Sequence, residues 1–447
     1  MIYSLPKETE LTIPILQEFL DKHARDVNDR YTRLKAAYES DHDILHQKAK
    51  PKYKPDNRIV VNFPKYITDT MNGFFVGIPI RVTSDDGKVA EYVEYLDRYN
   101  DQDDNNAELA KICSVFGRGY EMYYTDEESN LCITYLSPMD AFMVYDDSIV
   151  ERPMFFVRRY LDKDGIERGS VADKYGVRYF IATGGLRWVE DWKPHYFGEV
   201  PATEYMENSE RIGVFEPALS MVNAFNKALS EKANDVDYFA DAYLKVLGAK
   251  LNDGDIQFIR DNRVVNFDGD EADKVTVEFM DKPSNDVSQE NLLNRLERLI
   301  FQTCMVINSS DENFGTTSGI ALRHRLQAME NLRITKERKF TSGMNRRYKI
   351  LFGHPASKVP ADAWLSLNYR FSANIPANLL EEAQIAAQMD GITSKETQLK
   401  VLSVVESPQN EKEKIQKEAD EAQEQAIEKA AAFGFGEQGA DGVNENE

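Results

Sequence analysis

The apolar positions between Asp286 and Phe352 follow two helical patterns separated by a short polar run. The first pattern covers 288–308 and begins with Ser288, a residue type favoured at helix N-terminal caps. Its apolar side chains recur at steps of three and four, which keeps one face apolar: Leu292, Leu293, Leu296, Leu299, Ile300 and Ile307. The second pattern covers 319–352 and includes Leu322, Leu326, Met329, Leu332, Phe340, Met344 and Tyr348. Residues 309–318 are rich in Ser, Thr, Asn and Gly without periodicity, so we expect a loop there.

Upstream, the chain alternates between helical and strand-like patterns. Residues from Thr12 to about Gln47 predict one amphipathic helix, which Pro51 follows as a breaker. Shorter helices are predicted at 64–75 and 105–116. Between residues 117 and 182, short alternating runs are separated by turn-forming residues, a pattern typical of strands and hairpins.

The middle of the chain predicts a long helix followed by a small insert. Residues 191–212 are polar and aromatic without a clear period, and they stay unassigned. One long helix is predicted over 217–247, with a proline in its first turn. The insert at 248–287 contains an alternating strand pattern at 274–280.

The C-terminal part is predicted to be helical. One helix is expected over 377–389, and Thr393 to Glu396 has the spacing of a capping box before another. A last, very polar helix is expected from Ser407 to about Ala432. The tail at 433–447 is rich in Gly and acidic residues, and we expect it to be disordered.

The second helix of the opening pair is basic although the chain is acidic. Residues 319–352 hold nine Lys or Arg and two Glu, a net charge of +7 in a chain of net charge −22. Such segregation favours contact with a partner. The overall acidity argues against a protein that clamps DNA tightly, because phosphate neutralisation dominates that binding. It remains compatible with a passage along which DNA slides, and also with a simple role in solubility.

The composition limits where the protein is expected to reside and which disulfide or zinc sites it could form. The three cysteines have no CxxC spacing, which argues against a disulfide framework and a zinc knuckle. The N-terminus lacks the pattern of a signal peptide, and no run approaches the roughly 20 apolar residues that span a bilayer. We therefore expect a soluble protein made in the cytoplasm, with no membrane contact.

No group of residues predicts catalysis. A P-loop motif is absent, so no nucleotide-phosphate cradle is expected. His42 and His46 could hold a metal from one helix face, but a surface pair is the better interpretation because no third ligand is near in sequence. The acidic run 101–104 lacks the glycine and closing Glu of a calcium loop. Gly117-Arg-Gly119 is too short for a dinucleotide fingerprint and predicts backbone freedom at a corner between helix and strand. We expect neither an enzyme nor a cofactor or metal site.

Several local signatures, in this order, resemble the portal proteins of tailed bacteriophages, the head–tail connectors of long-tailed phages of Gram-positive hosts. The resembling segments extend from about residue 57 to about residue 350: Asn57–Ile67, Gly77–Pro79, Phe116–Glu121, Leu136–Asp140, Tyr145–Asp147, Asn234–Tyr243 and Thr317–Leu322.

The resemblance implies an α+β, mainly helical subunit that assembles into a homo-oligomeric ring, usually of about twelve copies (a 12-mer, or about a 13-mer when isolated). Its parts would be an N-terminal arm and α/β wing at 1–215, stem helices at 217–247 and 288–308, a small α/β clip at 248–287, a tunnel loop at 309–318, a long basic wing helix at 319–352, a helical crown at 353–406 and an acidic C-terminal helix with a disordered tail at 407–447.

Two sets of site residues follow from this mapping. The tunnel loop would face DNA in the channel with Ser309, Ser310, Asp311, Glu312, Asn313, Phe314, Thr316, Thr317 and Ser318. The basic helix would either support the channel by offsetting acidic rings or pair with acidic groups of the adjacent subunit, and we favour the second role for Arg323, Arg325, Arg333, Lys336, Arg338 and Lys339.

The implied function is a ring-shaped channel in the virion, at the capsid vertex, through which double-stranded DNA is packaged and ejected. The implied partners are the terminase large subunit, a head–tail adaptor, and the major capsid and scaffold proteins. Two alternatives stay open: a capsid or baseplate scaffold protein without a channel, and a DNA-processing enzyme that grips nucleic acid with the basic helix.

Overall fold

The computed structural model describes residues 2–51, 54–240, 244–247, 254, 276–279, 286–308, 319–374, 379–402, 404–405 and 408–434. The chain forms two compact units, one of residues 1–311 with 325–374 and one of residues 312–324 with 375–447. None of the described helices is long and apolar enough to cross a membrane.

The N-terminal arm is a strand followed by a bent helical segment. Strand β1 (Tyr3–Leu5) precedes α1 (Ile13–Asp26), which continues through a π-helical segment (Val27–Tyr31) into α2 (Thr32–Tyr38). The predicted helix to Gln47 is therefore too long. It ends near Ser40, whose positive φ of 71° leaves the helical region, and a 3₁₀ turn (Asp43–His46) follows.

Three helices and one short strand come next. Helix α3 (Phe63–Val76) confirms the prediction, with the Asn62 side chain accepting a hydrogen bond from the Lys65 N–H as its cap. Strand β2 (Arg81–Thr83) leads to α4 (Gly87–Tyr99), which the sequence analysis missed, and to α5 (Gln102–Phe116).

Two sheets form the β-rich region. The strands and hairpins predicted between residues 117 and 182 include the hairpin of β3 (Arg118–Thr125) and β4 (Leu131–Leu136), to which β11 (Ala202–Met206) adds as a third antiparallel strand. The larger sheet has the order β1-β5-β6-β7-β8-β10, with β9 also on β8. Its remaining strands are β5 (Ala141–Asp146), β6 (Pro153–Leu161), β7 (Glu167–Ala172), β8 (Gly176–Ile181), β9 (Arg187–Trp188) and β10 (Lys193–Pro194).

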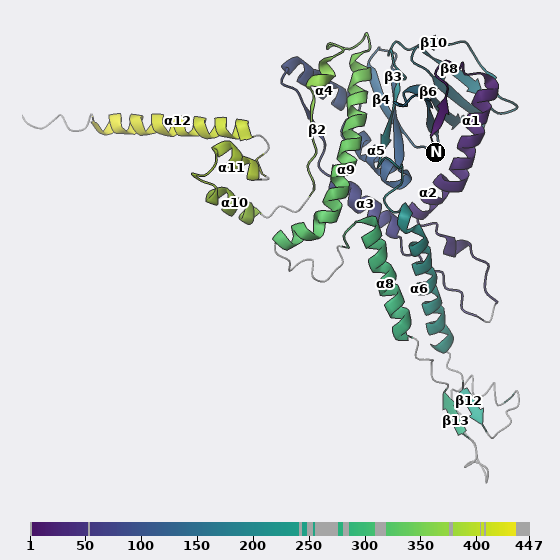
Figure 1. Ribbon diagram of the computed structural model, residues 1–447. Coiled ribbons are helices and arrows are strands. Elements are labelled where there is room, and N and C mark those ends of the chain that lie inside the picture. Colours follow the sequence, from purple (N-terminus) through teal and green to yellow (C-terminus); the bar gives the residue numbers. More distant parts are fainter. Residues whose placement is uncertain are drawn as a thin grey trace, which may run out of the picture. The chain divides into compact units, whose positions relative to one another are not determined.

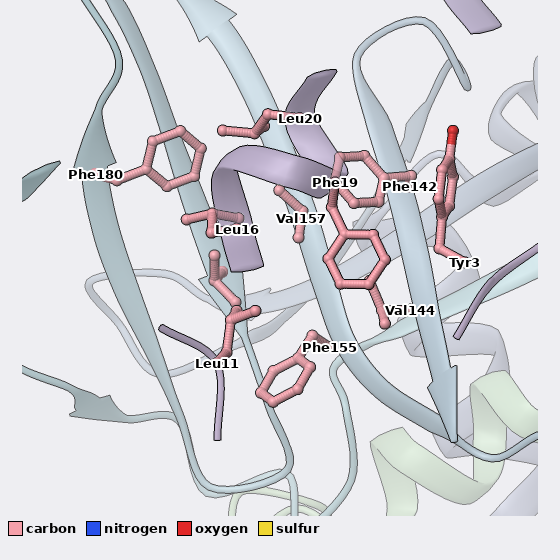
Figure 2. Packing of buried hydrophobic residues seen from close by; sticks show 11 residues of the cluster. Tyr3, Leu11, Leu16, Phe19, Leu20, Phe142, Val144, Phe155, Val157 and Phe180 are labelled. Atoms are coloured by element: carbon pink, nitrogen blue, oxygen red, sulfur yellow. The ribbon is translucent and has the colours of Figure 1, made fainter. Parts of the chain in front are cut away.

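The apolar face of α1 packs on this larger sheet. Leu16, Phe19 and Leu20 project from the helix toward Phe142 and Val157 of the strands, and all five are buried (Figure 2). Tyr3 of β1, which pairs in parallel with β5, closes the same cluster. The spacing that predicted an amphipathic helix is thus explained by one contiguous core.

Two helices follow the sheets and lie side by side in Figure 1. They are α6 (Leu219–Ala240), entered through a 3₁₀ turn (Glu216–Ala218), and α8 (Asp286–Cys304). The helix predicted over 217–247 is too long, because Leu244–Leu247 form strand β12, which pairs antiparallel with β13 (Thr276–Phe279). Leu-Lys-Val-Leu alternates only over its first three residues, so the pairing with β13, and not the local pattern, places it in a strand. The predicted strand over 274–280 is confirmed at 276–279.

The predicted basic helix is confirmed as α9 (Gly319–Phe352), 34 residues long. A 3₁₀ turn (Ala363–Ser366) and β14 (Asn368–Arg370), paired with β2, complete the first unit. The second unit contains α10 (Leu379–Gln388), α11 (Lys395–Val401) and α12 (Pro408–Gly434). The cap of α11 is Ser394 and not Thr393, since the Ser394 hydroxyl accepts from the Thr397 N–H at 3.3 Å.

Candidate functional site

The helix pair α6–α8 is held together by polar contacts along its length and by aromatic rings at its base. Lys232 forms an ion pair with Glu290, and the Gln289 amide donates to Asp235 Oδ2 at 3.1 Å. At the base, the ring of Phe63 in α3 lies 5.0 Å from that of Phe225 in α6 and 5.7 Å from that of Phe301 in α8. The pair is therefore fixed to the body of the first unit.

A second set of contacts fastens α6 to the extended segment 57–61. The backbone N–H groups of alternate residues in this segment donate to side chains spaced by four on α6. Asn57 N donates to Asn234 Oδ1 at 2.6 Å, Ile59 N to Ser230 Oγ at 2.9 Å, and Val61 N to Asn226 Oδ1 at 2.9 Å. Four helical residues rise about 6 Å and two extended residues rise about 6.6 Å, so the two repeats stay in step.

This polar seam joins two of the segments on which the family resemblance depends. The segments beginning at Asn57 and at Asn234 are far apart in sequence, and they meet through the first of these hydrogen bonds. Ser230 and Asn226 complete the seam, and both are buried. The sequence analysis did not single them out. Their signal was a Ser or Asn at every fourth position of the helix.

Both helices of the pair also expose apolar side chains. Val236 of α6 is 51% exposed, and Val287 and Leu292 of α8 are 71% and 50% exposed. Exposed aliphatic side chains on two neighbouring helices are typical of a surface that contacts protein.

Helix α9 is tied to the first unit by two buried cations. The Lys336 ammonium, fully buried, donates to Ala110 O at 3.0 Å and Ser114 Oγ at 2.5 Å, both in α5, and lies 2.7 Å from Glu207 Oε2. These three partners match the three N–H donors of an ammonium group. Lys336 is thus a fixed internal link between α9, α5 and the segment after β11.

The second buried cation is Arg347. Its Nε and Nη2 donate to the two oxygens of Glu121 in β3 at 2.9 and 2.5 Å, and Nη2 also donates to Asn106 Oδ1 at 2.7 Å. The Tyr123 hydroxyl donates to Glu121 Oε2 at 3.0 Å. This two-pronged geometry fixes the register of α9 on the three-stranded sheet.

The remaining predicted basic residues fall into three groups. Arg333 pairs within its own helix, with Glu330 and Glu337, each at 2.7 Å. Arg338 is exposed and Lys339 is half-buried, and the described part of the chain offers neither of them an ion pair or hydrogen bond. The side chains of Arg323 and Arg325, and the whole loop 309–318, lie outside the described residues.

Gly343 lets α9 approach the sheet closely. A Cβ atom there would lie 2.5 Å from the ring of Tyr205 in β11, which is closer than van der Waals contact permits. The Tyr205 ring also packs on Phe340, one turn earlier in α9, with ring centroids 4.7 Å apart. The glycine is therefore required by packing, a role that the sequence analysis did not assign.

Gly117 occupies the corner between α5 and β3, as predicted from backbone freedom. Its φ is 84°, and a Cβ atom there would lie 2.0 Å from Arg211 O. Only glycine satisfies both constraints.

A buried carboxylate joins the two sheets. Glu204 of β11 accepts from Arg211 Nε at 2.8 Å, from Arg118 Nη1 at 3.3 Å and from the Tyr145 hydroxyl of β5. Burial by itself would raise the pKa of the Glu204 carboxyl, but the Arg211 hydrogen bond and the Arg118 charge outweigh it and hold the pKa below its ordinary value. Glu204 stays ionised and keeps both guanidinium groups in place.

The candidate metal ligands are used in other ways. His42 is buried and its Nδ1 lies 3.2 Å from Asn226 Nδ2, whereas His46 Nε2 contacts Asp41 Oδ1 at 2.5 Å. Asp101 occupies the N-cap position of α5 with a φ of 50° and makes no side-chain capping hydrogen bond, and Asp103 lies in the first turn of that helix. Within the described ranges, no three or more His, Cys, Asp or Glu side chains are grouped so that they could hold a metal ion.

Comparison with known proteins finds a matching family model and relatives that are all described as phage portal proteins. The family model described as "Phage portal protein, SPP1 Gp6-like" matches residues 16–425. The portal protein of Bacillus phage SPP1 is 23% identical over 395 residues, which is 82% of this chain and 76% of the relative. The portal protein of Clostridium phage phiCD119 is 20% identical over 394 residues, 80% of this chain and 86% of the relative.

Among solved structures, a chain from the neck of an empty GTA particle aligns with a TM-score of 0.46 at 11% identity, over 76% of this chain and 89% of that chain.

Proposed function

Because this chain belongs to the SPP1 Gp6-like family of phage portal proteins, we propose that its copies form a ring at one vertex of a phage capsid and that double-stranded DNA passes through the ring. Family membership covers nearly the whole chain. The family is structural. Two relatives of this chain are named portal proteins, and their phages infect Bacillus and Clostridium, which are Gram-positive bacteria.

The observation that carries the proposal is the way α6 and α8 are mounted. A stem must hold its position while a charged polymer moves past it. The seam to 57–61 and the rings of Phe63, Phe225 and Phe301 fix the pair to the body of the unit at several points. We assign α6 and α8 to the stem, with their exposed aliphatic residues against neighbouring copies.

Residues 309–318 would form the tunnel loop between α8 and α9. Ser, Thr, Asn and Gly dominate the loop, and Asp311 and Glu312 add negative charge. Such a surface makes only weak contacts with phosphate, which suits DNA that must slide in either direction.

The other parts follow from the same mapping. The insert 248–287, between β12 and α8, would be the clip that docks the terminase large subunit and later a head–tail adaptor. Residues 1–215 and α9 would form the wing, and 353–406 the crown facing the capsid interior, next to the major capsid and scaffold proteins. We carry no role over to the acidic helix α12.

Deleting residues 309–318 and joining the ends with a short Gly-Ser linker tests the channel role. The variant should form rings of wild-type mass but package or retain much less DNA when it replaces the wild-type chain in infected cells. A matched control replaces the same ten positions with a shuffled order of the same residues, and it should package DNA nearly normally. Full packaging by the deletion variant would favour a scaffold protein without a channel.

A further inference from the structure

An acidic groove opens on the first unit between β2, α4 and the start of α5. Its volume is about 840 Å³. Five carboxylates line it against two cations, Arg81 and Arg98: Glu91, Glu94, Asp97, Asp101 and Asp103. Arg98 is engaged with Glu94 at 2.5 Å. The groove therefore has an excess of negative charge that its own cations do not balance.

One buried side chain in this groove has an unused acceptor. Gln102 is 2% exposed, and its Nε2 donates to Asn106 Oδ1 at 3.1 Å and to Glu121 Oε1 at 3.3 Å. These two bonds fix the amide, and its Oε1 finds no donor among the described residues. A buried carbonyl without a donor is costly, so the groove is complementary to a group that brings N–H donors.

Asp97 lies in the same groove, and its contacts do not fully offset the cost of burying its charge. Its Oδ1 accepts one hydrogen bond, from the Tyr348 hydroxyl of α9 at 3.2 Å. Burial raises the pKa of the Asp97 carboxyl to about 6, because its effect exceeds the opposing effects of the Arg347 charge and the Tyr348 hydrogen bond. Asp103 and Glu121 add further negative charge nearby. An incoming cation would stabilise the ionised form of Asp97.

The complementary group is present on α9 of the same chain. Arg338 is exposed, and neither it nor Lys339 has an ion pair with any described residue. Ten residues of α9 separate Arg338 from Tyr348, which is about 15 Å along the helix axis. Arg338 therefore does not reach the groove of its own chain, whereas a guanidinium from another copy can offer several donors in one plane.

We propose that the groove between β2, α4 and α5 receives Arg338 and Lys339 from a second copy of this chain. This rests on the proposed function, because it specifies one interface of the ring. The donating helix and the receiving groove are different surfaces, so each copy gives to one neighbour and receives from the other. Contacts of this head-to-tail kind do not stop at dimers, and they close into a ring when the rotation between neighbours divides a full turn.

The test uses paired charge reversals in the full-length chain. One variant carries Arg338→Glu and Lys339→Glu, and the other carries Glu91→Lys and Asp103→Lys, two exposed residues of the groove. Like charges placed across an interface oppose association, so each variant should lose rings by about tenfold or more in mass photometry. Lys163→Glu with Lys174→Glu changes charge equally on exposed turns of the larger sheet, and this control should assemble normally.

Recombination then identifies the partners. A chain carrying all four reversals should regain rings. An equimolar mixture of the two double variants should regain even-numbered rings, because the two variants then alternate and every interface is complementary. Circular dichroism and thermal melting of each variant establish that the subunit is folded. Rings from either double variant alone, or no recovery in both recombined samples, would overturn the pairing. If the wild-type chain forms no ring even when the capsid and scaffold proteins are co-expressed, the proposed function fails. Wild-type rings together with normal rings from a double variant refute only this interface.

Discussion

Replacing Arg347 by Met gives the sharpest prediction about how α9 is held. The guanidinium is fully buried, and two of its nitrogens donate to Glu121 while one also donates to Asn106. Its removal leaves the Glu121 carboxylate buried without a cation. Breaking one side of a buried ion pair costs about 3–5 kcal/mol, so we expect a loss of that size in the free energy of unfolding.

The second partner provides the internal check. Glu121→Gln leaves the Arg347 charge buried and should cost a similar amount, about 3–5 kcal/mol. The double variant removes both charges and keeps an amide oxygen that can accept the Tyr123 hydroxyl. It should therefore lose much less than the sum of the single losses, with a coupling of about 2–3 kcal/mol.

Guanidinium unfolding followed by tryptophan fluorescence measures these losses. All three tryptophans, Trp188, Trp192 and Trp364, belong to the first unit and report its unfolding. Lys349→Met is the control on the same helix, because the Lys349 side chain is 47% exposed and its ion pair with Glu199, at 2.9 Å, lies at the surface, so about 1 kcal/mol or less is expected. If Arg347→Met cost no more than this control, or if the single losses added in the double variant, the fixed-register argument would be refuted.

Three further predictions concern packing, the seam and pH. Gly343→Ala should lower the free energy of unfolding by about 1–3 kcal/mol, because its Cβ overlaps the Tyr205 ring. Gly73→Ala, which has open space at its Cβ, should instead stabilise α3 by about 0.5–1 kcal/mol. Equal effects of the two substitutions in chemical unfolding would contradict the close approach of α9 to the sheet. Ser230→Ala should cost about 1–2 kcal/mol by leaving the Ile59 N–H without its acceptor, whereas the exposed Ser220→Ala should be nearly neutral. Burial lowers the pKa of His23 from 6.5 to about 4, so the unfolded chain takes up a proton that the folded chain refuses. Stability should fall by about 3 kcal/mol as pH drops from 6.5 to 4, and His23→Gln should flatten this dependence.

The long helices were the most predictable part of the fold. Residues 319–352 were bounded correctly because period and length agree over nine turns or so. The two helices predicted too long, at 12–47 and 217–247, show why a pattern alone is insufficient. An apolar residue at helical spacing can equally belong to a strand, as Leu247 does in β12, or follow a backbone reversal, as at Ser40.

Short strands and individual side-chain contacts could not be predicted from the pattern of apolar and polar residues. Strand β1 has three residues, and its place beside β5 depends on a partner about 140 residues away. Helix α4 was missed although its buried residues, Val89, Tyr92, Val93 and Leu96, follow helical spacing, so its signal was present in the sequence.

The basic residues of α9 were recognised as important by their charge alone. Charge could not separate those that are buried in the chain from those that face outward, because that depends on acceptors in other elements, such as Glu207 for Lys336. The predicted contact with an adjacent subunit remains a prediction, and Arg338 with Lys339 now carry it. Substituting Lys336 would perturb the subunit itself and would not report on assembly.

The mass and shape of the purified full-length chain test the central claim most directly. A subunit of 51.1 kDa in a closed ring of about twelve or thirteen copies gives a particle of roughly 610–660 kDa, measured by mass photometry or native mass spectrometry. Negative-stain images of the same sample should show a central hole. Particles that stay monomeric or stop at a two-fold dimer, even when the capsid and scaffold proteins are co-expressed, would contradict the ring-shaped portal.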